Sequence, residues 1–153
     1  MSSRNGQDWY QGTFIPTNPN KCINKMAIQY RSSWESRFCH WLDANPSVRK
    51  WGYEVISLPY RFEVDGRVHQ YLVDFYAEIV NKNNSVDKYL IEIKPKNQGE
   101  KPKMPKRQSA KSMKNYVYEA HTYIRNQNKW NAAQTFCRQN GITFKILTKE
   151  NLF

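Results

Sequence analysis

The chain has 153 residues, and its 24 Lys and Arg residues outnumber 13 Asp and Glu residues, for a formal charge of +11. Aromatic residues make up 14% of the sequence, which excludes a wholly disordered chain because so much apolar surface can offset the entropy lost on folding. No stretch approaches the roughly 18 consecutive apolar residues of a membrane-spanning helix, so we expect no membrane partner. The length and charge predict one basic domain with an anionic partner.

The first 30 residues lack a clean hydrophobic period. They mix Asn, Gln and Pro with the aromatic residues Trp9, Tyr10 and Phe14. We therefore predict an N-terminal arm over residues 1–30, docked on its own domain or on a partner, and a single folded domain over residues 31–153.

Hydrophobic periodicity predicts the elements of that domain. A helix begins at Ser32 and ends at Asn45-Pro46, because Ser is a good N-cap and proline cannot continue a helix. Alternating apolar residues predict three strands, over residues 53–62, 68–80 and 89–94, of which the first two are joined by an Asp65-Gly66 turn.

The C-terminal part of the chain has a helical period again. We predict helices over residues 109–126 and 128–140, ended by Gly141, and a last strand over 142–147. The order of elements predicts a mixed α/β (α+β) domain with a central mixed sheet of about four or five strands flanked by helices.

Most of the positive charge lies in one segment. Between Lys94 and Lys114 the chain has eight Lys and Arg residues against one Glu, and three prolines interrupt any regular element there. A basic loop of this kind favours contact with a phosphate backbone. The predicted DNA-binding residues are Lys96, Lys101, Lys103, Lys106, Arg107, Lys111 and Lys114.

Four polar side chains can converge beside this loop. Glu92 and Lys94 are two residues apart and so project from one face of a strand. If the strands on either side of the 81–87 turn are neighbours, Asp74 joins them, and Glu35 lies at the edge of the apolar stripe of the first helix.

Carboxylates beside a lysine suit metal-assisted hydrolysis of phosphodiesters. Hard oxygen ligands prefer Mg²⁺ or Mn²⁺, and such an ion polarises the phosphate and lowers the pKa of a bound water. Each residue also has a structural interpretation. Glu35 could complete a capping box with Ser32, and Glu92 and Lys94 could form a solvated strand face. Asp74 is harder to explain structurally, because strands disfavour Asp.

The ordered set of Glu35, Val73-Asp74-Phe75 and Glu92-Ile93-Lys94 resembles the PD-(D/E)XK nuclease superfamily, although Val73 stands where that pattern has proline. The layout from Ser33-Trp34-Glu35 to Lys94-Pro95 is similar to TnsA-type transposon-end endonucleases. The whole chain most closely resembles the head-completion nucleases of T-even-type tailed phages.

The resemblance implies a restriction-endonuclease-like core and a role for each residue. Asp74, Glu92 and the Ile93 carbonyl would hold Mg²⁺ (or Mn²⁺), Glu35 would act directly or through water, and Lys94 would position the attacking water. It also implies a double-stranded DNA substrate, trimmed or cut after packaging, phage head or portal proteins as partners, and a location in the host cytoplasm or the virion.

Two other functions stay open on the sequence alone. The chain could be a non-catalytic DNA-binding adaptor of the virion or portal, or a transposon-end endonuclease subunit that acts only within a complex. Cleavage of DNA by the isolated protein would separate these alternatives from an autonomous nuclease.

Overall fold

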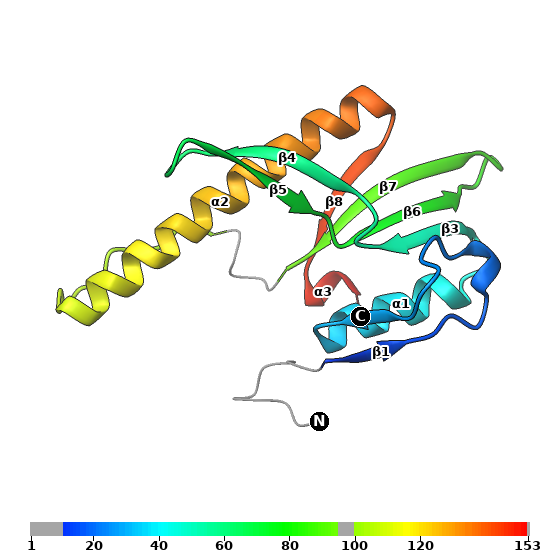
Figure 1. Cartoon of the computed structure of the whole chain (residues 1–153), viewed down its shortest axis with the longest axis horizontal. Helices are drawn as coiled ribbons and strands as arrows, with labels where there is room; N and C mark the ends of the chain where they lie inside the picture. The colour runs from blue at the N-terminus through cyan, green and yellow to red at the C-terminus, as the bar shows by residue number, and fades with distance from the viewer. Residues whose placement is uncertain (1–10, 95–99, 153) are drawn as a thin grey trace.

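The structure is a computed structural model, and it describes residues 11–94 and 100–152. Its centre is a mixed four-stranded sheet in the order β3 (Val48–Tyr53), β6 (Phe75–Val80), β7 (Val86–Ile93), β8 (Thr143–Leu147). β6 runs antiparallel to both β3 and β7, and β8 runs parallel to β7. This architecture confirms the predicted mixed α+β fold and its central sheet (Figure 1).

One face of the sheet is covered by α1 (Ser33–Ala44). Phe38 and Leu42 on this helix pack in a core with Phe75 and Ile91 from the sheet. The described part of the predicted arm joins the same core, through β1 (Gly12–Phe14) and β2 (Ile28–Tyr30), which flank the short 3-10 helix η1 (Pro19–Lys21). Trp9 and Tyr10 lie outside the described residues.

The strands predicted over 53–62 and 68–80 are wrong in their bounds. Each is divided: β3 ends at Tyr53 before β4 (Ser57–Phe62), and β5 (Arg67–Leu72) ends before β6 begins at Phe75. β4 and β5 form a hairpin of their own that leaves the central sheet. Backbone hydrogen bonds tie the two exits together, from the N–H of Glu54 to the carbonyl of Asp74 and from the N–H of Val73 to that of Ile56.

The opposite face is covered by α2 (Ala110–Asn140), a single helix of 31 residues where two helices were predicted. No Gly or Pro occurs in the range, so nothing in it forces a break. Ala133 and Cys137 pack on Leu90 and Phe144 of the sheet. Gly141 ends the helix as predicted, in the left-handed conformation with φ 66°.

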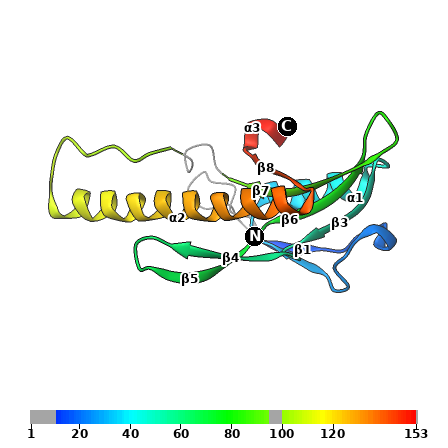
Figure 2. The same cartoon turned by 90° about the horizontal axis from the view of Figure 1, so that it is seen from above.

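The N-terminal half of α2 extends beyond the sheet, and the segment that leads to it runs back beside it (Figures 1 and 2). The β4–β5 hairpin lies along the middle of the helix (Figure 2). A short helix, α3 (Lys149–Leu152), follows β8. Within the residues described, no helix is both long and apolar enough to cross a membrane.

Candidate active site

Asp74 lies where the chain passes from the hairpin into the central sheet. Its Oδ2 atom accepts a hydrogen bond of 2.8 Å from the backbone N–H of Ile93 on β7. The residue is only 9% exposed. This bond therefore holds a buried Asp against the last residue of the neighbouring strand.

Glu92 and Lys94 share the face of β7 on which Leu90 packs against α2, as the strand alternation predicts. The Lys94 Nζ atom lies 2.9 Å from Oε2 of Glu92. Glu92 is 3% exposed, and its other oxygen, Oε1, has no hydrogen-bond donor among the described residues. The hydroxyl of Tyr71 on β5 is likewise buried, and burial together with the neighbouring charge of Glu92 raises its pKa.

Several neighbouring groups act on the pKa of Asp74, and they act in opposite directions. Burial raises the pKa of Asp74 well above its ordinary value, and the charge of Glu92 raises it further, while the bond from Ile93 lowers it. Two carboxylates that are both buried repel each other, and one lysine offsets only part of their charge. A cation bound between Asp74 and Glu92 would therefore stabilise the two carboxylates.

The residues present fit a divalent metal ion. Oε1 of Glu92 is buried without a hydrogen-bond partner among the described residues, and Asp74 accepts the bond from Ile93 through Oδ2. Anionic carboxylate oxygens are the ligands that Mg²⁺ and Mn²⁺ prefer. In the described part of the chain, no three His, Cys, Asp or Glu side chains are gathered closely enough to hold a metal, so a third protein ligand would be a backbone oxygen or a neutral side-chain oxygen.

Glu35 comes from α1, on the other face of the sheet. Its N–H donates to the Oγ of Ser32, which forms the N-cap, but its own Oε1 accepts from the N–H of Arg31 and from the hydroxyl of Tyr53. Burial and the charge of Glu35 raise the pKa of Tyr53, so this hydroxyl stays a donor. The charge of Glu35 also reaches Asp74, whose pKa it raises.

The sequence interpretation missed Lys129, which α2 places on the same side of the sheet. Its Nζ atom lies 5.2 Å from the centre of the Tyr71 ring. A signal was available, because Lys129 is four and eight residues before the buried Ala133 and Cys137. A lysine on the buried stripe of a helix is unusual.

Comparison with known proteins agrees with this geometry. The TnsA-like endonuclease N-terminal domain matches residues 45–149, which include Asp74, Glu92 and Lys94. The chain belongs to the TnsA-like endonuclease family. It is also 35% identical over 144 residues to the head completion nuclease of Enterobacteria phage T4, a match that covers 94% of this chain and 93% of that protein.

The TnsA-like family and the sheet topology together confirm the expected restriction-endonuclease-like core. The matched range begins at residue 45, so Glu35 lies ahead of it. The family match therefore includes the Asp74 and Glu92 carboxylates but not α1. The alignment with the T4 protein is longer and covers 94% of this chain.

The predicted DNA-binding residues lie along one extension of the molecule. Lys96 is outside the described residues. The other six lie on the segment before α2 and on its first turns, which project away from the sheet (Figure 2): Lys101, Lys103, Lys106, Arg107, Lys111 and Lys114. The first turns of α2, which carry Lys111 and Lys114, therefore extend away from the sheet that carries the carboxylates.

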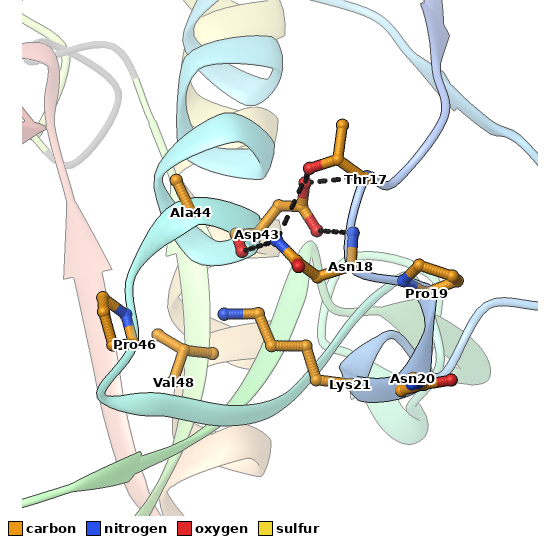
Figure 3. A pocket seen from close by; sticks show the side chains of 9 residues that line it. All are labelled: Thr17, Asn18, Pro19, Asn20, Lys21, Asp43, Ala44, Pro46 and Val48. Atoms are coloured by element: carbon orange, nitrogen blue, oxygen red, sulfur yellow. Dashed lines mark hydrogen bonds between the residues drawn. The ribbon is translucent and has the colours of Figure 1, made fainter.

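A hollow of about 460 Å³ occurs elsewhere, between η1 and the end of α1 (Figure 3). It lies at the β3 edge where Val48 pairs with Ile79, whereas Asp74 precedes the opposite end of β6. Burial alone would raise the pKa of Asp43 in this hollow, but hydrogen bonds from Thr17 and Asn18 hold it below its ordinary value. The carboxylate is therefore already satisfied by donors of its own chain.

Proposed function

We propose that this protein is a metal-dependent nuclease that hydrolyses phosphodiester bonds of double-stranded DNA. The observation that carries the proposal is the buried Oε1 of Glu92, which has no donor among the described residues although Lys94 contacts the other oxygen of the same carboxylate. A buried acceptor without a partner is costly, and a cation bound beside Asp74 would satisfy it. A structural ion pair would have no need of the second carboxylate, that of Asp74.

Asp74, Glu92 and the carbonyl of Ile93 are the residues that would hold the ion, Mg²⁺ or Mn²⁺. When bound, the ion supplies charge neutralisation at the phosphate and a lowered pKa for a coordinated water. Lys94 would hold the attacking water by a hydrogen bond from its ammonium, which Glu92 keeps in place.

Glu35 would act on this site through its charge or through a water molecule. Its fixed position is supported by the Tyr53 hydroxyl and the Arg31 N–H, both of which donate to Oε1. The basic residues before and within the first turns of α2 would bind the phosphate backbone without reading sequence.

The biological setting follows from the relative of this chain in phage T4, which is a head completion nuclease. We propose that this protein likewise trims or cuts packaged phage DNA during head completion, next to head or portal proteins. It would act in the host cytoplasm during assembly or stay in the virion.

The test is cleavage of supercoiled plasmid by the isolated protein with Mg²⁺, with Mn²⁺ and with EDTA. We expect nicking with metal, none with EDTA and none by Asp74→Asn. Asp87→Asn is the matched control, because Asp87 lies on β7 at the end away from the site. DNA binding without cleavage under any metal would favour the adaptor, and cleavage only after partner proteins are added would favour a subunit of a complex.

A further inference from the structure

Lys129 is a half-buried cation for which the described part of the chain provides no hydrogen-bond acceptor. Its side chain packs above the ring of Tyr71, at 5.2 Å from Nζ to the ring centre. No carboxylate of the described residues pairs with it, and no described oxygen accepts a hydrogen bond from its ammonium. An ammonium with three donors that loses water on folding needs an anion or a polar partner.

Contacts between α2 and the hairpin hold Lys129 in place. One turn before it, Arg125 donates a hydrogen bond of 2.6 Å to the hydroxyl of Tyr60. Asn128, the residue before Lys129, donates a hydrogen bond of 2.6 Å to Oε1 of Glu63. Asn128 also accepts a hydrogen bond of 2.9 Å from the backbone N–H of Glu63. These bonds fix the rotation of the helix, so the backbone of Lys129 stays on the side of α2 that faces Tyr71.

Contact with the Tyr71 ring brings Lys129 to the side of the sheet on which Glu92 and Lys94 lie. Burial lowers the pKa of Lys129, and the charge of Lys94 lowers it further, while Glu92 and Asp74 oppose this effect and Arg125 adds to it. The Tyr71 ring that Lys129 covers belongs to the residue whose hydroxyl lies near Glu92. Lys129 and Lys94 therefore approach the same carboxylates from α2 and from β7.

We propose that Lys129 binds the scissile phosphate, donating a hydrogen bond from its ammonium to a non-bridging oxygen of the diester. This inference rests on the nuclease function proposed above and adds a substrate contact to it. An anionic phosphate is the acceptor that the ammonium lacks, and seating it under α2 places it beside Asp74 and Glu92. The added cation would also offset negative charge that develops on the phosphate during hydrolysis.

The alternative is that Lys129 only packs on Tyr71. The chain offers a matched control, because the Nζ of Lys145 lies at the same 5.2 Å from the ring of Tyr89. Lys145 is on β8 and pairs in register with Ile91, whose side chain packs in the α1 core on the other face of the sheet. Replacing either lysine removes an equivalent ring interaction, but only Lys129 faces the carboxylates.

The experiment compares Lys129→Met, Lys129→Gln, Lys129→Arg and Lys145→Met with the wild-type protein, after circular dichroism has identified the folded variants. Binding of a short DNA duplex is measured in EDTA over a range of salt concentrations, where no cleavage occurs. We expect the Met and Gln variants of Lys129 to flatten the log–log salt slope by about 0.9, the value for one phosphate neutralised by one cation. Lys129→Arg should keep the slope, and Lys145→Met should match the wild type.

Single-turnover cleavage at saturating DNA with Mg²⁺ provides the second measurement. We expect the rate to fall by roughly 10- to 1,000-fold for Lys129→Gln, with partial rescue by Lys129→Arg and a wild-type rate for Lys145→Met. A wild-type slope and rate in Lys129→Gln, in a protein that cleaves, would overturn the proposed phosphate contact and leave the nuclease function standing. If the wild type does not cleave under any metal, the nuclease function fails, and the salt slope alone decides whether Lys129 touches phosphate.

Discussion

The ammonium of Lys94 lies 2.9 Å from one oxygen of Glu92, while the other oxygen of that carboxylate has no donor among the residues that the structure describes. The ion pair with Lys94 gives the two carboxylate oxygens of Glu92 different surroundings. Oε2 is neutralised by a side chain two residues along the chain, and Oε1 stays available to a cation beside Asp74. Lys94 thus orients the carboxylate, in addition to the role in holding water that we propose for it.

Replacing Asp74 with Asn should abolish cleavage without unfolding the protein. The amide oxygen can still accept the hydrogen bond from Ile93, but the side chain no longer carries the charge that would hold a divalent ion. We expect cleavage to fall by about 1,000-fold or more. Mg²⁺ should raise the melting temperature of the wild type and not that of this variant, and wild-type nicking by it would refute the metal assignment.

The same variant should change how stability depends on pH when EDTA is present. The folded pKa of Asp74 is raised, so ionising this carboxyl costs stability above its unfolded pKa of about 3.9. The full loss of stability applies at pH values above the pKa of Asp74 in the folded protein. It vanishes as the pH falls below the pKa of Asp74 in the unfolded chain. Asp74→Asn should therefore melt a few degrees above the wild type near pH 8, and this difference should disappear by about pH 4. An equal difference at both values would contradict this coupling.

Glu35→Gln separates a structural role from a role in the acidic site. Gln can still accept hydrogen bonds from the Arg31 N–H and the Tyr53 hydroxyl, so the melting temperature should barely move. We expect cleavage to fall by roughly 10- to 100-fold if the charge acts on the metal through water. Tyr53→Phe is the control that removes a hydrogen bond to the same oxygen and keeps the charge. Full activity in Glu35→Gln would leave Glu35 as an N-terminal helix residue only.

The basic segment before α2 can be tested separately from the chemistry. Replacing Lys103, Lys106 and Arg107 with Ala should flatten the salt slope of DNA binding by roughly two to three units, about one for each phosphate that these side chains neutralise. Affinity should fall equally for unrelated sequences, because backbone contacts carry no base information. Cleavage at saturating DNA should change far less than in Asp74→Asn. An unchanged slope would place the DNA elsewhere on the protein.

The ends of the helices could be predicted from the sequence because helix capping and termination depend on residues close together in the chain. Ser32 and Asn45-Pro46 set the ends of α1, and Gly141 ends α2 through its left-handed backbone. The division between β5 and β6 was missed because alternation continues through Val73 and Asp74. What separates the two strands is the packing of the hairpin on α2, which is far away in sequence.

The sequence indicated some residues of the candidate site and not others. Asp74 stood out because a carboxylate interrupted an apolar strand, and Glu92 with Lys94 followed from their two-residue spacing. Lys129 was missed although the predicted helix over residues 128–140 already placed it four and eight residues before Ala133 and Cys137, because a lysine next to an apolar stripe is ordinarily solvated. Its approach to the carboxylates depends on the tertiary position of α2, which no spacing along the chain reveals.

If a duplex lies along α2, the length of this helix sets a minimum size for the DNA that can be both held and cut. An α-helix rises about 1.5 Å per residue, so Lys111 in its first turn and Lys129 lie about 27 Å apart along the axis. B-form DNA advances about 3.4 Å per base pair, so this separation corresponds to about eight base pairs. If the first turn holds phosphate, bonds closer than this to one end of a duplex should be cut slowly. A blunt end would then be shortened until the remaining duplex no longer reaches the first turn of the helix.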